Sequence, residues 1–176
     1  CRDVLLLPDH LHVAVNLSMI QILNDDITGL VTETLRETGL SPGRLKLEIT
    51  ESVVMDDPKL VIKALEELKT HDFTVAIDDF GTGYSSFSYL KELPVDTLKI
   101  DRSFVQKIHE DSTSLAIARA IVAVGHELGL TVVAEGVENH HQLSCLQRLN
   151  CDFVQGFLTG RPMVAQDMGA ILAQAS

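Results

Sequence analysis

The sequence predicts an α/β fold: an incomplete TIM-like (β/α)₈ barrel with about six of the eight strand–helix units present. First, short apolar segments of strand type alternate with amphipathic helical segments along the 176 residues. Second, neither linkers nor low-complexity stretches interrupt this alternation, which is typical of parallel sheets. Third, every expected strand ends in polar side chains. We therefore treat residues 1–176 as one domain.

The first units are read from periodicity and from residues typical of helix ends. Residues 11–17 are apolar at alternate positions, which indicates a strand. Residues 25–38 have apolar side chains at helical spacing, and Gly39 is a helix stop. Alternating leucine and isoleucine mark a second strand over 45–49. An aspartate followed by a proline opens a helix over 57–69.

The central units repeat this pattern. We expect a strand over 73–78, which leads into a glycine-rich loop at 80–83. A short helix over 86–93 and a strand over 95–100 follow. A run of aspartate, serine and threonine then caps a long helix over 111–129.

The last units are shorter. The expected elements are a strand at 130–134, a helix at 140–149, a strand at 153–155 and a final helix from about Gln166. Six strand–helix units result, and they fit either an open doubly wound sheet or part of a (β/α)₈ barrel.

Polar residues at the carboxyl ends of the strands favour the barrel. An open sheet concentrates function where the strand order reverses, whereas a barrel gathers all strand ends around one mouth. All six expected strands carry such residues. A complete barrel has eight strand–helix units, so two units would be missing here. In chain order these residues are Asn16; Glu48 with Glu51; Asp78 with Asp79; Lys99 with Asp101; Glu135 with Glu138; and Gln155.

Composition excludes several classes of protein. The formal net charge is −11, so the chain would repel polymeric nucleic acid. No apolar run reaches the roughly 18 to 20 residues that span a bilayer, and the start does not resemble a secretory signal. The 3 cysteines have neither disulfide-framework nor zinc spacing, which favours reduced thiols and a cytoplasmic location.

The strand-end carboxylates predict a metal site. Glu48, Asp78, Asp79 and Glu135, with Asn16 as a neutral oxygen donor, could not all stay ionised in one mouth without cations. Hard oxygen ligands without cysteine or histidine point to Mg²⁺ or Mn²⁺. The adjacent aspartates could bridge two metals, an arrangement used for phosphoryl displacement.

Two further side chains have expected roles beside these carboxylates. Lys99 would remain an ammonium that orients the attacking hydroxide and steadies charge on a phosphate. Glu51 would hold the glycine loop after Asp79 by accepting backbone hydrogen bonds. Asp79-Phe80-Gly81 occurs without the other protein-kinase motifs, and the loop glycines do not form a dinucleotide-binding motif.

Taken together, these motifs resemble those of the EAL domain family in order along nearly the whole chain. The matching segments are Asn16-Leu17-Ser18, Glu48-Ile49-Thr50-Glu51-Ser52, residues 78–86 from Asp78 to Ser86, Lys99-Ile100-Asp101-Arg102-Ser103-Phe104, Glu135-Gly136-Val137-Glu138, and Gln155-Gly156-Phe157 with Arg161-Pro162. One such segment alone would be weakly specific, whereas the ordered set is highly specific.

The resemblance implies a bacterial cyclic di-GMP phosphodiesterase that uses two Mg²⁺ or Mn²⁺ ions and releases linear pGpG. Lys99 matches the residue that positions the nucleophilic water, and Glu51 matches the glutamate that holds a loop linked to dimerisation, so a homodimer is expected. Five residues match metal ligands and three match substrate-binding or supporting positions. They are Asn16, Glu48, Asp78, Asp79 and Glu135, and Asp101, Glu138 and Gln155, respectively.

Two departures from the family pattern modify this expectation. Thr159-Gly160 stand where the family usually carries an aromatic and a small residue. The Glu-Ala-Leu motif that names the family, with its metal-binding glutamate, does not precede Asn16 here. We therefore expect a domain without its first two strands and with little activity, whose parent chain carries sensor or diguanylate cyclase domains.

Alternative functions make different predictions. A non-catalytic cyclic di-GMP receptor would bind without hydrolysis, although it would need neither Lys99 nor the paired aspartates. An unrelated metal-dependent barrel enzyme would show no activity toward cyclic di-GMP.

Overall fold

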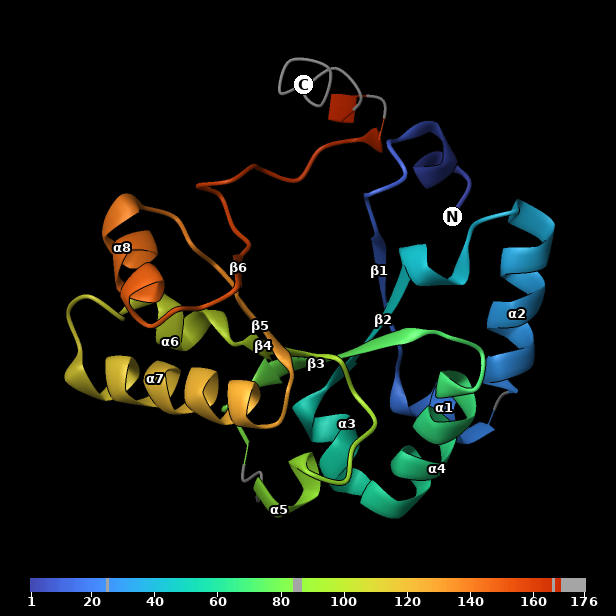
Figure 1. Cartoon of the computed structure of the whole chain (residues 1–176), viewed down its shortest axis with the longest axis horizontal. Coiled ribbons are helices and arrows are strands. Elements are labelled where there is room, and N and C mark those ends of the chain that lie inside the picture. The colour runs from blue at the N-terminus through green and yellow to red at the C-terminus, as the bar shows by residue number, and fades with distance from the viewer. Residues whose placement is uncertain (25, 84–86, 166, 169–176) are drawn as a thin grey trace.

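A computed structural model describes residues 1–24, 26–83, 87–165 and 167–168 of the chain. Strands and helices alternate through most of it (Figure 1). The strands are β1 (Val13–Asn16), β2 (Leu45–Thr50), β3 (Thr74–Phe80), β4 (Thr97–Ile100), β5 (Thr131–Ala134) and β6 (Phe153–Val154). The α-helices are α1 (Met19–Asn24), α2 (Ile27–Thr38), α3 (Glu51–Asp56), α4 (Pro58–Lys69), α5 (Phe87–Leu90), α6 (Arg102–Gln106), α7 (Ser112–Glu127) and α8 (His140–Arg148), and short 3₁₀ helices cover Asp3–Leu6 and Pro42–Arg44.

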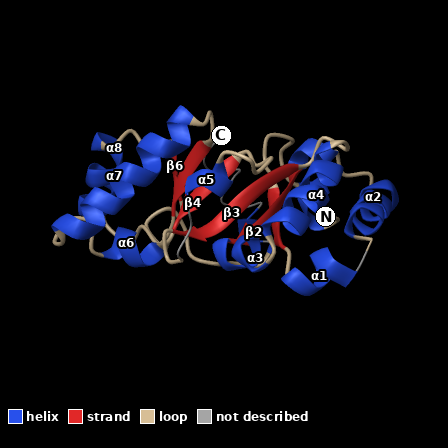
Figure 2. Cartoon of the chain, turned by 90° about the horizontal axis from the view of Figure 1, so that it is seen from below, coloured by secondary structure: helices blue, strands red, loops and turns tan. Residues whose placement is uncertain are grey.

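All six strands form one parallel sheet in the order β1-β2-β3-β4-β5-β6. The sequence order never reverses, so the sheet has no switch point of the doubly wound kind. The sheet curls into a partial barrel with helices around its outer side (Figures 1 and 2). The predicted barrel architecture is confirmed, and the carboxyl ends of the strands lie at one edge.

The sheet is held to its helices by a buried apolar core. Ile77 on β3 and Leu98 on β4 are no more than 1% exposed, and Leu65 and Leu68 of α4 are fully buried. The outer strands are more open, because Val15 on β1 is 41% exposed and Phe153 on β6 is 63% exposed. The core therefore lies under the central strands, where the polar strand ends also converge.

The long helices begin at the caps that the sequence predicted. The Asp57 carboxylate accepts the Leu60 N–H at the start of α4, and Asp111 accepts the N–H groups of Thr113 and Ser114 in α7. After α2, Gly39 has φ of 75°, a left-handed conformation typical of a helix end.

Three short helices, α1, α3 and α6, were not predicted. Each has five or six residues, too few to show helical periodicity in the sequence. The helix predicted from Gln166 onward falls almost wholly outside the described residues. Within the described ranges, no helix is long and apolar enough to cross a membrane.

Candidate functional site

Lys99 is the centre of the polar edge of the sheet. Its ammonium lies 2.8 Å from Glu48 Oε2, 3.1 Å from Asp78 Oδ1 and 2.7 Å from Glu135 Oε1. Glu48, Asp78 and Lys99 lie on β2, β3 and β4, and Glu135 directly follows β5. The Lys99 side chain is only 5% exposed. Four successive strands therefore bring one cation and three carboxylates together, as expected for a shared barrel mouth.

A β-bulge places both aspartates of the pair at this site. Ile77 pairs with Leu98 and Phe80 with Ile100, so Asp78 and Asp79 together lie opposite Lys99 alone. Asp79 has φ of 54°, and its N–H donates to Asp78 Oδ1 at 3.0 Å. The sequence placed this pair where the chain turns after the strand, but β3 continues to Phe80. The β-bulge within β3, and not a turn after the strand, therefore lets both aspartates reach the site.

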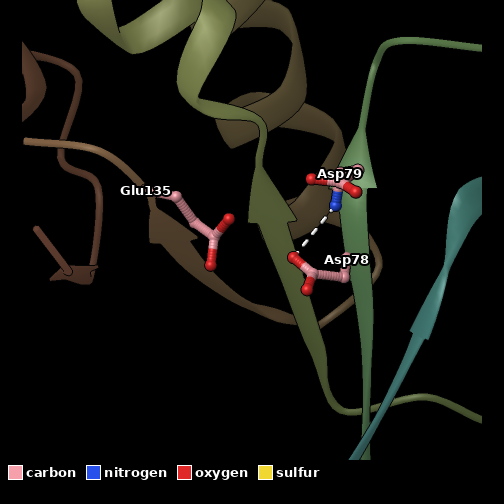
Figure 3. A group of neighbouring side chains, drawn as sticks. All are labelled: Asp78, Asp79 and Glu135. Carbon is pink, nitrogen blue, oxygen red and sulfur yellow. Dashed lines mark hydrogen bonds between the residues drawn. The ribbon is translucent and has the colours of Figure 1, made fainter. Parts of the chain in front are cut away.

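Asp78, Asp79 and Glu135 form a compact oxygen cluster. One carboxylate oxygen from each lies within 4.8 Å of the others. Figure 3 shows the carboxylates of Asp78 and Glu135 turned toward one another, with Asp79 at the next position along β3. Such a group of hard oxygen donors suits Mg²⁺ or Mn²⁺.

The electrostatics of the cluster also favour a cation. Burial raises the pKa of Asp79, and the nearby charges of Asp78 and Asp101 raise it further. Burial likewise raises the pKa of Glu135, despite the opposing hydrogen bond from Lys99. One ammonium does not neutralise so many carboxylates. A divalent cation would supply the missing positive charge, so the residues present fit the metal that the sequence predicted.

Lys99 itself is held in its charged form. Burial alone would lower its pKa, but hydrogen bonds to Glu135 and Glu48 outweigh burial and raise the pKa above its ordinary value. An amine so strongly protonated at neutral pH donates hydrogen bonds and does not act as a base. This matches the ammonium expected from the sequence.

Glu51 joins the site to the glycine loop. It is the first residue of α3 and is 2% exposed. Its Oε2 accepts the N–H of Gly81 at 2.7 Å and that of Gly83 at 3.2 Å. A Cβ atom on Gly83 would come within 2.8 Å of Glu51 Oε1, which explains why glycine fits there. The loop-holding contact expected from the sequence is present.

Replacing Glu51 tests this contact. We expect Glu51→Ala to lower the free energy of unfolding by about 1–3 kcal/mol, because two backbone N–H groups lose a charged acceptor. Urea denaturation measures the change. Glu66→Ala is the matched control, because Glu66 is an exposed residue of α4. Equal, small effects of the two substitutions would contradict a role for Glu51 in holding the loop.

The remaining predicted residues lie around the cluster at different depths. Asp101 is 8% exposed and accepts the Ser103 N–H at 3.0 Å, which caps α6 beside Asp79. Asn16 pairs in register with Glu48 at the end of β1 and is exposed. Glu138 and Gln155 line a pocket of about 230 Å³ together with Glu135.

The sequence did not predict the residue that holds the loop after β5. Gln142 is 3% exposed, and its Oε1 accepts the N–H groups of Glu138 and Asn139 at 2.7 and 3.1 Å. Its Nε2 donates to the Gln106 carbonyl at 3.2 Å. Asn139 followed three residues later by Gln142 forms a capping box, a signal that was present in the sequence.

Comparisons with known proteins agree with this geometry. A family model described as EAL domain matches residues 1–162. The bifunctional diguanylate cyclase/cyclic di-GMP phosphodiesterase MucR of Pseudomonas aeruginosa is 45% identical over 177 residues, covering 98% of this chain and 26% of MucR. The chain spans 21–26% of the length of three curated relatives that it matches.

Two solved structures resemble the sheet and its helices closely. The MucR phosphodiesterase in complex with c-di-GMP aligns with a TM-score of 0.86 at 46% identity, over 89% of this chain and 64% of that chain. A manganese and c-di-GMP complex of BlrP1 from Klebsiella pneumoniae aligns with a TM-score of 0.86 at 34% identity, over 93% of this chain and 42% of that chain.

Proposed function

Because this chain belongs to the EAL domain family, we propose that it forms the site of a cyclic di-GMP phosphodiesterase in bacterial second-messenger signalling. The observation that carries the proposal is the Lys99 ammonium among Glu48, Asp78 and Glu135, beside a cluster of oxygen donors. That arrangement suits an anionic phosphodiester whose charge is neutralised by metal ions. The likeness to MucR, solved with c-di-GMP, supports the choice of substrate.

We assign the metal ligands from the carboxylates at the strand ends. Asp78, Asp79 and Glu135 would hold one or two Mg²⁺ or Mn²⁺ ions, with Glu48 and Asn16 on the neighbouring strands as further oxygen donors. When bound, the metal would neutralise phosphate charge and lower the pKa of water. The manganese complex of BlrP1 supports this choice of cation.

The protein side chains would orient the reaction that releases linear pGpG. Lys99 would donate hydrogen bonds to the attacking water and to the phosphate, because its charged form is strongly favoured. Glu51 would keep the loop after β3 in place. Asp101, Glu138 and Gln155 would support the cluster or contact the dinucleotide from its rim.

Other domains are expected to control this site. MucR combines diguanylate cyclase and phosphodiesterase activities, and this chain covers about a quarter of it. We infer that the chain works alongside a sensor or diguanylate cyclase domain and pairs with a second copy. By itself the chain should turn over slowly, because among the described residues β1 and β6 each pair on one side only.

The proposal is tested by incubating the purified chain with cyclic di-GMP and Mn²⁺. We expect slow formation of linear pGpG, detected by liquid chromatography, and a rate on the order of a thousandfold lower for Asp78→Asn. Binding of cyclic di-GMP without any pGpG would favour the receptor function instead. A chain that neither binds nor hydrolyses the dinucleotide would refute the proposal.

A further inference from the structure

The pocket beside Glu135 is built from three segments that are distant in sequence. Its walls come from α6, from the loop after β5 and from the segment after β6. Its volume is about 230 Å³, which is room for one purine ring system. The side chains that line it are Arg102, Gln106, Glu135, Glu138, Gln155 and Phe157.

Close backbone contacts fix these walls relative to one another. Gly136 has φ of 68°, and a Cβ atom there would lie 2.6 Å from the Cβ of Arg102. A Cβ atom on Gly156 would lie 2.3 Å from the Val137 carbonyl oxygen. Gln142 links the loop to α6 through its hydrogen bonds. The start of the Arg102 side chain is therefore held at a defined place in the pocket wall.

Arg102 provides positive charge in a pocket that also contains carboxylates. It is exposed, and within the described residues its guanidinium makes no hydrogen bond or ion pair. Glu135 and Glu138 line the same pocket without pairing with it. An arginine that is positioned by its backbone but has no protein partner is available to bind a ligand.

The other lining groups suit a base better than a phosphate. Glu138 would repel an anion, whereas its carboxylate can accept hydrogen bonds from N–H groups. Phe157 is 51% exposed, and Arg161 covers one face of its ring at 4.8 Å from the centroid. Amide groups from Gln106 and Gln155 complete a lining of planar and hydrogen-bonding groups. In the proposed function, the scissile phosphate would lie at the metal cluster and Lys99 instead.

We propose that Arg102 is a specificity residue that reads one guanine of cyclic di-GMP. Its guanidinium would donate to O6 and N7, the acceptor edge of guanine, while Glu138 accepts from the opposite N–H edge. Adenine presents an amino group in place of O6, so it would meet the donor edge of Arg102 unfavourably. The inference rests on the proposed function, because it takes cyclic di-GMP as the ligand.

The test compares cyclic di-GMP with its 7-deazaguanine analogue, in which a C–H group replaces the N7 acceptor. Binding of both is measured by calorimetry with Ca²⁺ present to neutralise the carboxylates. We expect the wild-type chain to bind cyclic di-GMP about tenfold more tightly than the analogue. Arg102→Met should weaken cyclic di-GMP binding on the order of tenfold and bind the two ligands equally.

Two controls keep the outcome interpretable. Arg119→Ala removes an exposed arginine of α7 away from the pocket and should leave both affinities unchanged. Arg102→Ala, with circular dichroism to verify folding, repeats the test without the methionine side chain. Equal weakening of both ligands by Arg102→Met would assign Arg102 to phosphate and overturn the inference, as would no effect. A wild-type chain that binds neither ligand would overturn the proposed function and this inference with it.

Discussion

Lys99→Met is expected to lower the free energy of unfolding by about 3–5 kcal/mol at pH 7 in the absence of divalent cations. The methionine has similar length but leaves Glu48, Asp78 and Glu135 without the ammonium that lies 2.7–3.1 Å from them. Chemical denaturation measures the loss. Phosphodiesterase activity should fall below detection, because the group that orients the attacking water is gone.

The pH dependence of this variant identifies the cause. Burial raises the pKa of Glu135, and the loss of Lys99 removes the hydrogen bond and the charge that oppose this rise. The native state of the variant would therefore bind more protons than the unfolded state. Stability of the variant should therefore rise as the pH is lowered from 7 toward 5. In the wild type, the pKa of Lys99 is raised, so Lys99 stays charged and its contribution to the free energy of unfolding is fully present at neutral pH. It is lost only as the pH rises above the ordinary lysine value of 10.5.

Lys63→Met is the matched control for this experiment. Lys63 is an exposed residue of α4, so its loss should change stability by no more than about 0.5 kcal/mol. If Lys99→Met were as stable as this control at pH 7, the ammonium would not be neutralising the cluster.

Asp78→Asn is expected to separate stability from activity. The change removes one negative charge from the carboxylate cluster. Burial and the charge of Asp78 both raise the pKa of Asp79, which shows that the negative charges repel one another there. We therefore expect the metal-free variant to be at least as stable as the wild type. Turnover of cyclic di-GMP should fall on the order of a thousandfold, because the cluster loses a carboxylate next to the reacting phosphate.

Metal-dependent stability provides the second measurement. At 100 times the dissociation constant, Mn²⁺ should stabilise the wild type by about 2.7 kcal/mol and should stabilise Asp78→Asn far less. Asp72→Asn is the control, because Asp72 is exposed and precedes β3 at the other end of the strand. An undiminished response to Mn²⁺ in Asp78→Asn would exclude Asp78 as a ligand.

Much of the fold could be predicted because its signals are local. Asp57 before Pro58 and the polar run at 111–114 mark helix starts through contacts within one turn. By contrast, α3 and α6 are too short to show a period. Both begin where a strand has just ended, so they form where the tertiary structure turns the chain.

The candidate site was predictable only in part for a related reason. Parallel strands align their carboxyl ends, so Asp78, Lys99 and Glu135 could be expected near one another from their places in the pattern. The bulge opposite Lys99 could not be foreseen, since it depends on the register between β3 and β4. Likewise Arg102 lay within a recognised motif, but its pocket needs segments from three parts of the chain.

The sequence by itself determined the strand–helix order, the barrel class and the polar residues that end each strand. Periodicity, caps and residue chemistry are properties of neighbouring positions, so they can be read without coordinates. The tertiary structure alone decided that Lys99 contacts three carboxylates while Asn16 remains exposed. Those outcomes depend on strand register and sheet curvature, which arise from hydrogen bonds and packing between segments far apart in the chain.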